Sequence, residues 1–158
     1  MATTDFGNSA YNTGIAITGS ITTGLASGSV GTSAQFANPL LGTAAGAYAT
    51  NADLVLTMGA TFTTGAGNPY LQAVLLAGAS GVGETGRVSS SQLFPTYGAK
   101  QAFLVPSLGY TGTEWIMVKG IWVPSSSYLT LALLNLSGTT FPASGMTATL
   151  YLYGGAAG

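Results

Sequence analysis

The chain has few side chains that can do acid, base or nucleophilic chemistry. Its 158 residues include three Lys or Arg, four Asp or Glu, and no His or Cys. Without His, it lacks the commonest general base and the commonest metal ligand. The lack of Cys excludes thiolate zinc sites, disulfides and Cys nucleophiles, and the serines have no His to activate them. We therefore expect no enzyme activity, no metal site and no cofactor.

Two short motifs could carry chemistry, but each has a simpler interpretation. Residues 81–86 match the G-x-G-x-x-G pattern of dinucleotide-binding loops. Residues 87–91 lack the helical periodicity that such a loop requires next, so we expect a flexible loop between strands. Asn51 and Asp53 could contribute to a calcium site. Because calcium needs about six to eight oxygen ligands, we prefer a turn-capping Asx pair.

Carboxylate chemistry depends on three residues of the expected sandwich, Asp53, Glu84 and Glu114. Glycoside hydrolysis requires two carboxyl groups that face each other across a cleft. Glu114 stands at the start of an expected strand and Glu84 at the tip of a loop, and these loops contain no further acid or His to tune either one. We therefore do not expect a catalytic pair.

Aromatic residues offer binding chemistry instead. Trp115 and Trp122 are seven positions apart on one expected strand, which places them on opposite faces. At least one should lie in the core, and the other should pack beneath the N-terminal segment or a neighbouring subunit. Tyr151 and Tyr153 share a face of the last expected strand. Such a stripe could stack on sugar rings or bury against another subunit.

The low charge also limits the partners. Three cations cannot form a basic patch, so we expect no nucleic-acid partner. No apolar run approaches the ~20 residues that span a bilayer, which predicts no membrane partner. The first residues lack the features of a secretion signal, and we expect a soluble protein made in a cytoplasm. A net charge of −1 gives little repulsion between copies, which favours a homo-oligomer.

The elements that must position these residues are strands. Apolar residues recur with the period of two that is typical of a half-buried strand, and clusters of Gly, Pro, Ser and Asn separate the runs. The expected strands are 54–62, 70–76, 101–105, 115–123, 128–136 and 146–153. We therefore predict an all-β fold, an antiparallel, jelly-roll-like β-sandwich over residues 51–158.

Residues 1–50 differ, because their apolar side chains are sparse and separated by Thr, Ser, Gly and Ala. We predict an extended N-terminal arm that forms one or two short strands and becomes ordered on a partner surface. A free flexible tail is the alternative. The residues expected to bind the partner are Ile15, Ile17, Ile21, Leu25, Val30 and Phe36, together with Tyr151 and Tyr153 of the sandwich.

Three stretches, 33–38, 54–76 and 133–145, resemble the head decoration, or cement, proteins of tailed bacteriophages. They contain a Phe-x-Asn entry into the sandwich, two apolar strands, and an Asn-x-Ser-Gly turn followed by Pro-Ala-Ser-Gly. The resemblance implies a virion protein on the outer capsid surface, made in the host bacterial cytoplasm. It also implies the major capsid protein as partner and a homo-oligomer, with a trimer favoured.

Two other functions stay open. The middle of the chain, where Glu114-Trp115 opens a strand that ends at Val123-Pro124, looks like the jelly roll of a carbohydrate-binding module. The chain would then be a glycan- or receptor-binding module of a phage fibre. A further alternative is another structural part of a virion or a self-assembling surface-layer subunit.

Overall fold

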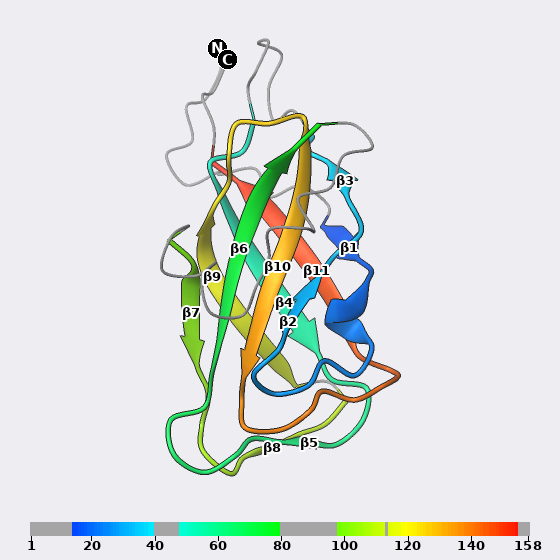
Figure 1. The fold of residues 1–158 in the computed structure, drawn as a ribbon, viewed down its shortest axis with the longest axis vertical. Coiled ribbons are helices and arrows are strands. Elements are labelled where there is room, and N and C mark those ends of the chain that lie inside the picture. Colours follow the sequence, from blue (N-terminus) through cyan, green and yellow to red (C-terminus); the bar gives the residue numbers. More distant parts are fainter. Residues whose placement is uncertain (1–13, 40–47, 80–97, 113, 155–158) are drawn as a thin grey trace, which may run out of the picture.

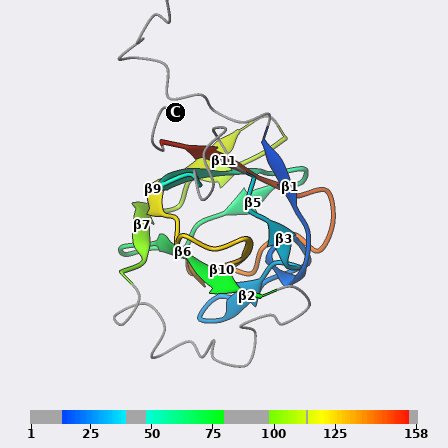
Figure 2. The ribbon, with the colours of Figure 1, turned by 90° about the horizontal axis from the view of Figure 1, so that it is seen from above.

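The structure is a computed structural model, and it describes residues 14–39, 48–79, 98–112 and 114–154. Two antiparallel sheets pack face to face around one core (Figures 1 and 2). The all-β antiparallel sandwich predicted from the sequence is confirmed. The strands are β1 (Ile15–Ile17), β2 (Val30–Thr32), β3 (Phe36–Ala37), β4 (Asn51–Thr57), β5 (Phe62–Thr63), β6 (Tyr70–Gly78), β7 (Lys100–Phe103), β8 (Gly109–Tyr110), β9 (Trp115–Trp122), β10 (Tyr128–Leu136) and β11 (Thr147–Tyr153).

The strand order is that of a jelly roll. One sheet has the order β1-β11-β4-β9, and the other has β2-β10-β6-β7, with β3 also paired to β10. The first strand thus lies beside the last, and β2 lies beside the last but one, which is the arrangement that two Greek keys produce. The remaining pair, β5 and β8, closes one end (Figure 1). In the described part of the chain, no helix has the length and apolar character to cross a membrane.

The period-two pattern places one face of each long strand in the core. On β4, Leu54 and Leu56 are fully buried, and on β11, Leu150 and Leu152 are as well. Strand β6 is covered on both faces, as its nearly continuous apolar run predicts. Its odd-numbered residues from 71 to 75 lie in the main core, while Val74 and Leu76 belong to a smaller buried cluster.

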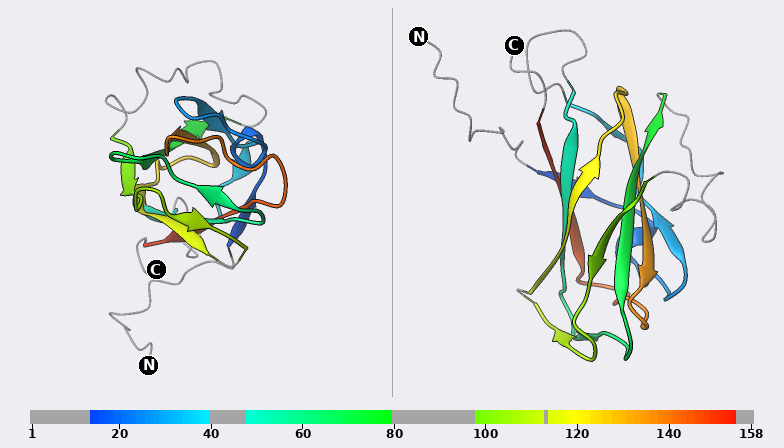
Figure 3. Two further views of the ribbon diagram at one scale, coloured as in Figure 1. Left: turned by 90° about the horizontal axis from the view of Figure 1, so that it is seen from below. Right: turned by 90° about the vertical axis from the view of Figure 1, so that its left-hand side faces the viewer.

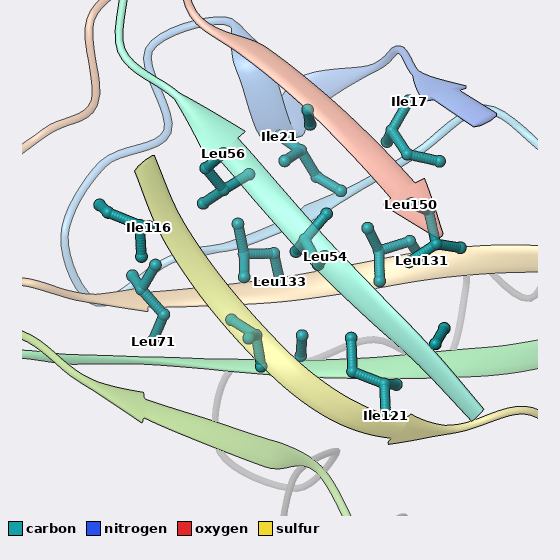
Figure 4. Packing of buried hydrophobic residues seen from close by; sticks show 14 of the residues in the cluster. Ile17, Ile21, Leu54, Leu56, Leu71, Ile116, Ile121, Leu131, Leu133 and Leu150 are labelled. Carbon is teal, nitrogen blue, oxygen red and sulfur yellow. The ribbon is translucent and has the colours of Figure 1, made fainter. Parts of the chain in front are cut away.

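The N-terminal region is part of this sandwich, which corrects the predicted arm. Residues 15–17 pair with β11, and residues 30–37 supply the two strands that pair with β10. A 3-10 turn, η1 (Ser20–Thr22), places Ile21 in the core, and Figure 4 shows its side chain and that of Ile17 beside Leu54 and Leu150. The described part of the expected arm is therefore ordered by its own chain. Residues 1–13 and 40–47 lie outside the described residues.

Hydrogen bonds join this N-terminal region to the end of β10. The buried amide Nδ2 of Asn135 donates to the backbone oxygens of Leu25 and Thr139, each at 2.9 Å. Its Oδ1 accepts a bond from the amide of Ser137 at 3.0 Å. A buried polar group without hydrogen-bond partners is costly. The bonds of Asn135 therefore stabilise the packing of the N-terminal region against β10.

Candidate functional site

The large apolar side chains that stay exposed gather on one edge of the sandwich. In the described ranges there are six, and all lie between residues 103 and 122. They belong to the end of β7, to the connection between β7 and β8, and to β9. Strands β7 and β9 contact each other where the two sheets meet, on the side that faces the viewer in the right-hand view of Figure 3. We call this surface the apolar band; its members are Phe103, Val105, Leu108, Trp115, Met117 and Trp122.

The apolar band wraps around the edge of the sandwich. On β9, Ile116 and Val118 point into the core, so Trp115 and Met117, which alternate with them, point outward. On β7, Ala102 packs against the core, so its neighbour Phe103 lies on the outer face of the other sheet. The band therefore presents apolar groups on both sides of one edge.

A β-bulge on β9 brings the two tryptophans onto the same face. Two residues of β9, Lys119 and Gly120, stand opposite one residue of β4, Asp53. The extra residue reverses the alternation of side chains, so Trp122 faces outward with Trp115. The predictions that they lie on opposite faces and that at least one is in the core are wrong, because Trp115 is 66% exposed and Trp122 60% exposed.

Asp53 holds this bulge in place. Its Oδ1 accepts a hydrogen bond from the backbone amide of Gly120 at 2.9 Å and another from the hydroxyl of Tyr153 at 3.1 Å. Gly120 has a φ of 69°, in the left-handed region that favours glycine. The predicted turn-capping Asx pair is wrong, since both residues lie within β4, where Asn51 donates to Thr50.

A rigid turn presents two further members of the band. The buried side chain of Thr64 donates to the carbonyl of Val105 at 2.6 Å and accepts from the amide of Leu108 at 3.1 Å. Between them, Ser107 has a φ of 57° and is the only residue other than glycine with a positive φ in the described ranges. Such a conformation costs roughly 1–3 kcal/mol and persists only where the surroundings fix it. The turn therefore holds the side chains of Val105 and Leu108 on the outside of the sandwich.

The two tyrosines lie next to the band without forming part of it. Tyr151 and Tyr153 share the outer face of β11, as predicted, and both are half-buried. Tyr153 donates to Asp53, and an ideal Cβ on Gly14 would lie 3.0 Å from the Tyr151 ring. Both rings thus have contacts within the chain, and β4 lies between their strand and β9. Their role in binding stays a prediction.

The apolar side chains of the N-terminal region that were expected to bind a partner lie mainly in this protein's own core. Three are buried there, namely Ile17, Ile21 and Leu25. The other three are partly buried, with Ile15 and Phe36 packed against the main core and Val30 against the smaller cluster. Burial within the sandwich removes the first three from any contact with another chain, which corrects that expectation.

The acidic residues do not form a catalytic pair in the described region. Glu114 precedes the residue that pairs with Thr57, four positions along β4 from Asp53. That offset separates the two acids by roughly 13–17 Å along the strands, beyond the spacing of glycosidase carboxylates. In the same region, no three His, Cys, Asp or Glu side chains lie where they could hold a metal ion. The segment 81–86, which includes Glu84, lies outside the described residues.

The sequence contained one signal for the band, namely the apolar character of 115–123 on both faces of the expected strand. Gly120 was the only indication that this strand is bulged, and a single glycine in a chain with 24 of them predicts little. Comparisons of the chain with protein-family models, with curated proteins and with solved structures find no match.

Proposed function

We propose that this protein is a structural subunit of a tailed-phage virion that decorates the outer surface of an assembled head. The sequence resemblance to decoration proteins supports this function, and so does the lack of His and Cys, which leaves the chain little to catalyse with. Its work would then be to bury surface against other protein subunits. The major capsid protein is the proposed partner on the shell. We expect the groups with which it contacts this protein to be apolar or uncharged.

The apolar band is the observation that carries this proposal. Monomeric proteins rarely expose a contiguous apolar patch larger than a few hundred Å², and larger patches mark interaction sites. Tryptophan, phenylalanine and methionine are the residues that protein interfaces enrich, while charged residues are depleted at interface centres. Lys119 is the one charged residue on the exposed face of β9. A protein surface that covers this band in the working assembly would account for its composition.

Binding to undecorated heads tests the proposal directly. The purified protein would be mixed with heads that lack decoration and sedimented with them, and the bound amount would be measured against the free concentration. We expect saturable binding with a fixed number of copies per head. Heads loaded beforehand with the native protein provide the control, because their sites are filled. Binding that fails to saturate, or that is equal on filled heads, would contradict the proposal.

A second candidate function is glycan binding by a module of a phage fibre. The observation that favours it is the shared outward face of Trp115 and Trp122, with polar Thr57 and Asn51 beside them on β4. Aromatic faces can stack on sugar rings while neighbouring polar groups bind hydroxyls. A screen against immobilised neutral oligosaccharides, with Trp115→Ala as the matched variant, tests it. Binding that the variant abolishes would favour a glycan module over a decoration protein.

A further inference from the structure

From the placement of the apolar band on both sides of one edge, and resting on the proposed function, we infer that this edge inserts into an apolar groove on the capsid surface. Strands β7 and β9 would enter the groove together, with their outer faces against its two walls. This deepens the proposed function, because it states the shape of the partner surface and which side chains contact it.

The aromatic side chains of the band point in opposite directions across the edge. Trp115 and Trp122 stand on the outer face of β9, whereas Phe103 stands on the outer face of β7, in the other sheet. Side chains stand roughly perpendicular to a sheet, and two packed sheets lie about 10 Å apart. A flat partner surface could therefore cover the tryptophans or Phe103, but not both. A concave surface that reaches around the edge covers all three.

The exposed area also requires both sides of the edge. Trp115 is 66% and Trp122 60% exposed, so with roughly 200 Å² for each aromatic side chain the two rings offer on the order of 250 Å². Phe103 is 76% exposed and adds roughly 150 Å² from the other side. A specific, stable interface buries at least about 600 Å² on each partner. The three smaller members of the band bring the sum close to this area, whereas either side alone falls well below it.

Much of the band is held in place before any partner binds. Asp53 fixes the bulge that turns Trp122 outward, and Thr64 fixes the turn that presents Val105 and Leu108. Groups that are already ordered lose little conformational entropy on binding, so more of the contact energy contributes to affinity. The edge can therefore enter the groove without rearranging.

The charges at the edge are compatible with an apolar groove. Lys119 stands between Met117 and Trp122 along β9 and is exposed. A lysine stem can lie along apolar surface while its ammonium group reaches water. Glu114, which precedes β9, and Lys100, which begins β7, are exposed as well. These three charges fit the hydrated rim of an interface whose centre is uncharged.

The edge should contact the groove through side chains rather than through added backbone pairing. In the described part of the chain, β9 ends one sheet and β7 ends the other (Figure 3). A lysine in the middle of an edge strand and a β-bulge both block continuous pairing with another chain. Strand β9 has both, at Lys119 and Gly120. Single substitutions can therefore remove the contact from one side at a time.

Binding of such variants to undecorated heads tests the groove. Phe103→Ser removes an aromatic ring from one side of the edge, and Trp115→Ser removes one from the other. We expect each variant to bind at least about tenfold more weakly than the wild type, because each loses an aromatic anchor. The control Phe103→Leu keeps an apolar side chain and should bind more tightly than Phe103→Ser. A second control, Ala16→Ser, changes an exposed residue of β1 at the opposite edge and should bind like the wild type.

The result that would overturn the groove is a serine variant, on either side, that binds heads as tightly as the wild type. Hydroxyl-radical footprinting gives an independent answer without any substitution. Oxidation of Phe103, Trp115 and Trp122 would be measured by mass spectrometry in free protein and in protein bound to heads. We expect all three to be protected on heads. Protection of the tryptophans alone, or of Phe103 alone, would indicate a flat partner surface and would also overturn the inference.

The failure of this inference can be told apart from the failure of the proposed function. Saturable binding that depends on one side of the edge only would overturn the groove and leave decoration intact. A wild-type protein without saturable binding to heads would contradict decoration, and the groove that rests on it would fall as well. Saturable binding that both serine variants weaken would support both.

Discussion

The two edges of the sandwich treat apolar side chains in opposite ways. At the edge formed by β1, η1 and β2, short segments rich in Thr, Ser and Gly turn their few aliphatics inward, and Ile17 and Ile21 are buried. At the edge formed by β7 and β9, outward-facing positions also carry large apolar side chains. Trp115, Met117 and Phe103 are turned outward there.

This contrast shows that apolar content alone does not locate an exposed apolar surface. The sparse aliphatics of the N-terminal region suggested a segment that needed a partner chain, yet its strands pair with β10 and β11. The sequence of β9 suggested that at least one of its two tryptophans lies in the core, yet both face outward. The difference arises from pairing over a separation of more than 100 residues at one edge and from one bulge at the other.

The largest loss of stability should come from removing the side chain of Ile21, at the edge formed by β1, η1 and β2. The variant Ile21→Ala removes a fully buried side chain and should lower the free energy of unfolding by about 2–5 kcal/mol. Urea unfolding followed by circular dichroism measures it. The control Ala26→Ser changes an exposed residue in the same region and should cost under about 0.5 kcal/mol. Equal midpoints for both variants would mean that the N-terminal region is detached in solution.

A smaller loss should follow at Asn135, which joins that edge to β10. The variant Asn135→Leu removes the amide that bonds to Leu25 and Thr139, so we expect a loss of roughly 1–3 kcal/mol in unfolding free energy. The matched control is Gln72→Leu, whose amide bonds to Gln101 at the surface, and it should change stability little. Chemical denaturation of both proteins provides the comparison, and a larger cost at Gln72 would refute the assigned role of Asn135.

At the edge formed by β7 and β9, a change in the bulge of β9 should lower the free energy of unfolding by about 1 kcal/mol. Gly120 has a positive φ and open space where a Cβ would stand, so Gly120→Ala adds backbone strain without a collision. Gly120→Asn should cost less, because Asn tolerates the left-handed region. Thermal unfolding ranks the two. An alanine variant as stable as the wild type would show that the bulge relaxes easily and does not fix the outward face of Trp122.

Solution conditions should have the smallest effect on contacts through the apolar band. The chain has no His to titrate between pH 5 and 8, and Lys119 is the one charged residue of β9. We expect the dissociation constant for undecorated heads to change less than threefold between about 0.05 and 0.5 M NaCl. Sedimentation at each salt concentration measures it, and a tenfold weakening would show that charges dominate the contact.

Much of the fold could be predicted from the sequence, because period-two runs such as 128–136 and 146–153 reflect a local property of strands. The positions of β1 and β2 could not, since three-residue strands have too few side chains to show a period. The face of Trp122 could not either, because a bulge depends on the partner strand. The partner-binding residues predicted from the sequence therefore lie mostly at the N-terminal edge, where Ile17, Ile21 and Leu25 are buried, and no sequence pattern showed that Trp115 and Trp122 both face outward.

Tryptophan fluorescence tests most directly whether the apolar band is the surface that other subunits cover. The chain has two tryptophans, and both belong to the apolar band, so their emission reports on this surface alone. Emission and acrylamide quenching would be recorded for free protein at high dilution and for protein bound to undecorated heads. We expect strong quenching at high dilution, and weaker quenching with blue-shifted emission once subunits assemble. Emission and quenching that stay the same in assembled protein would contradict the account.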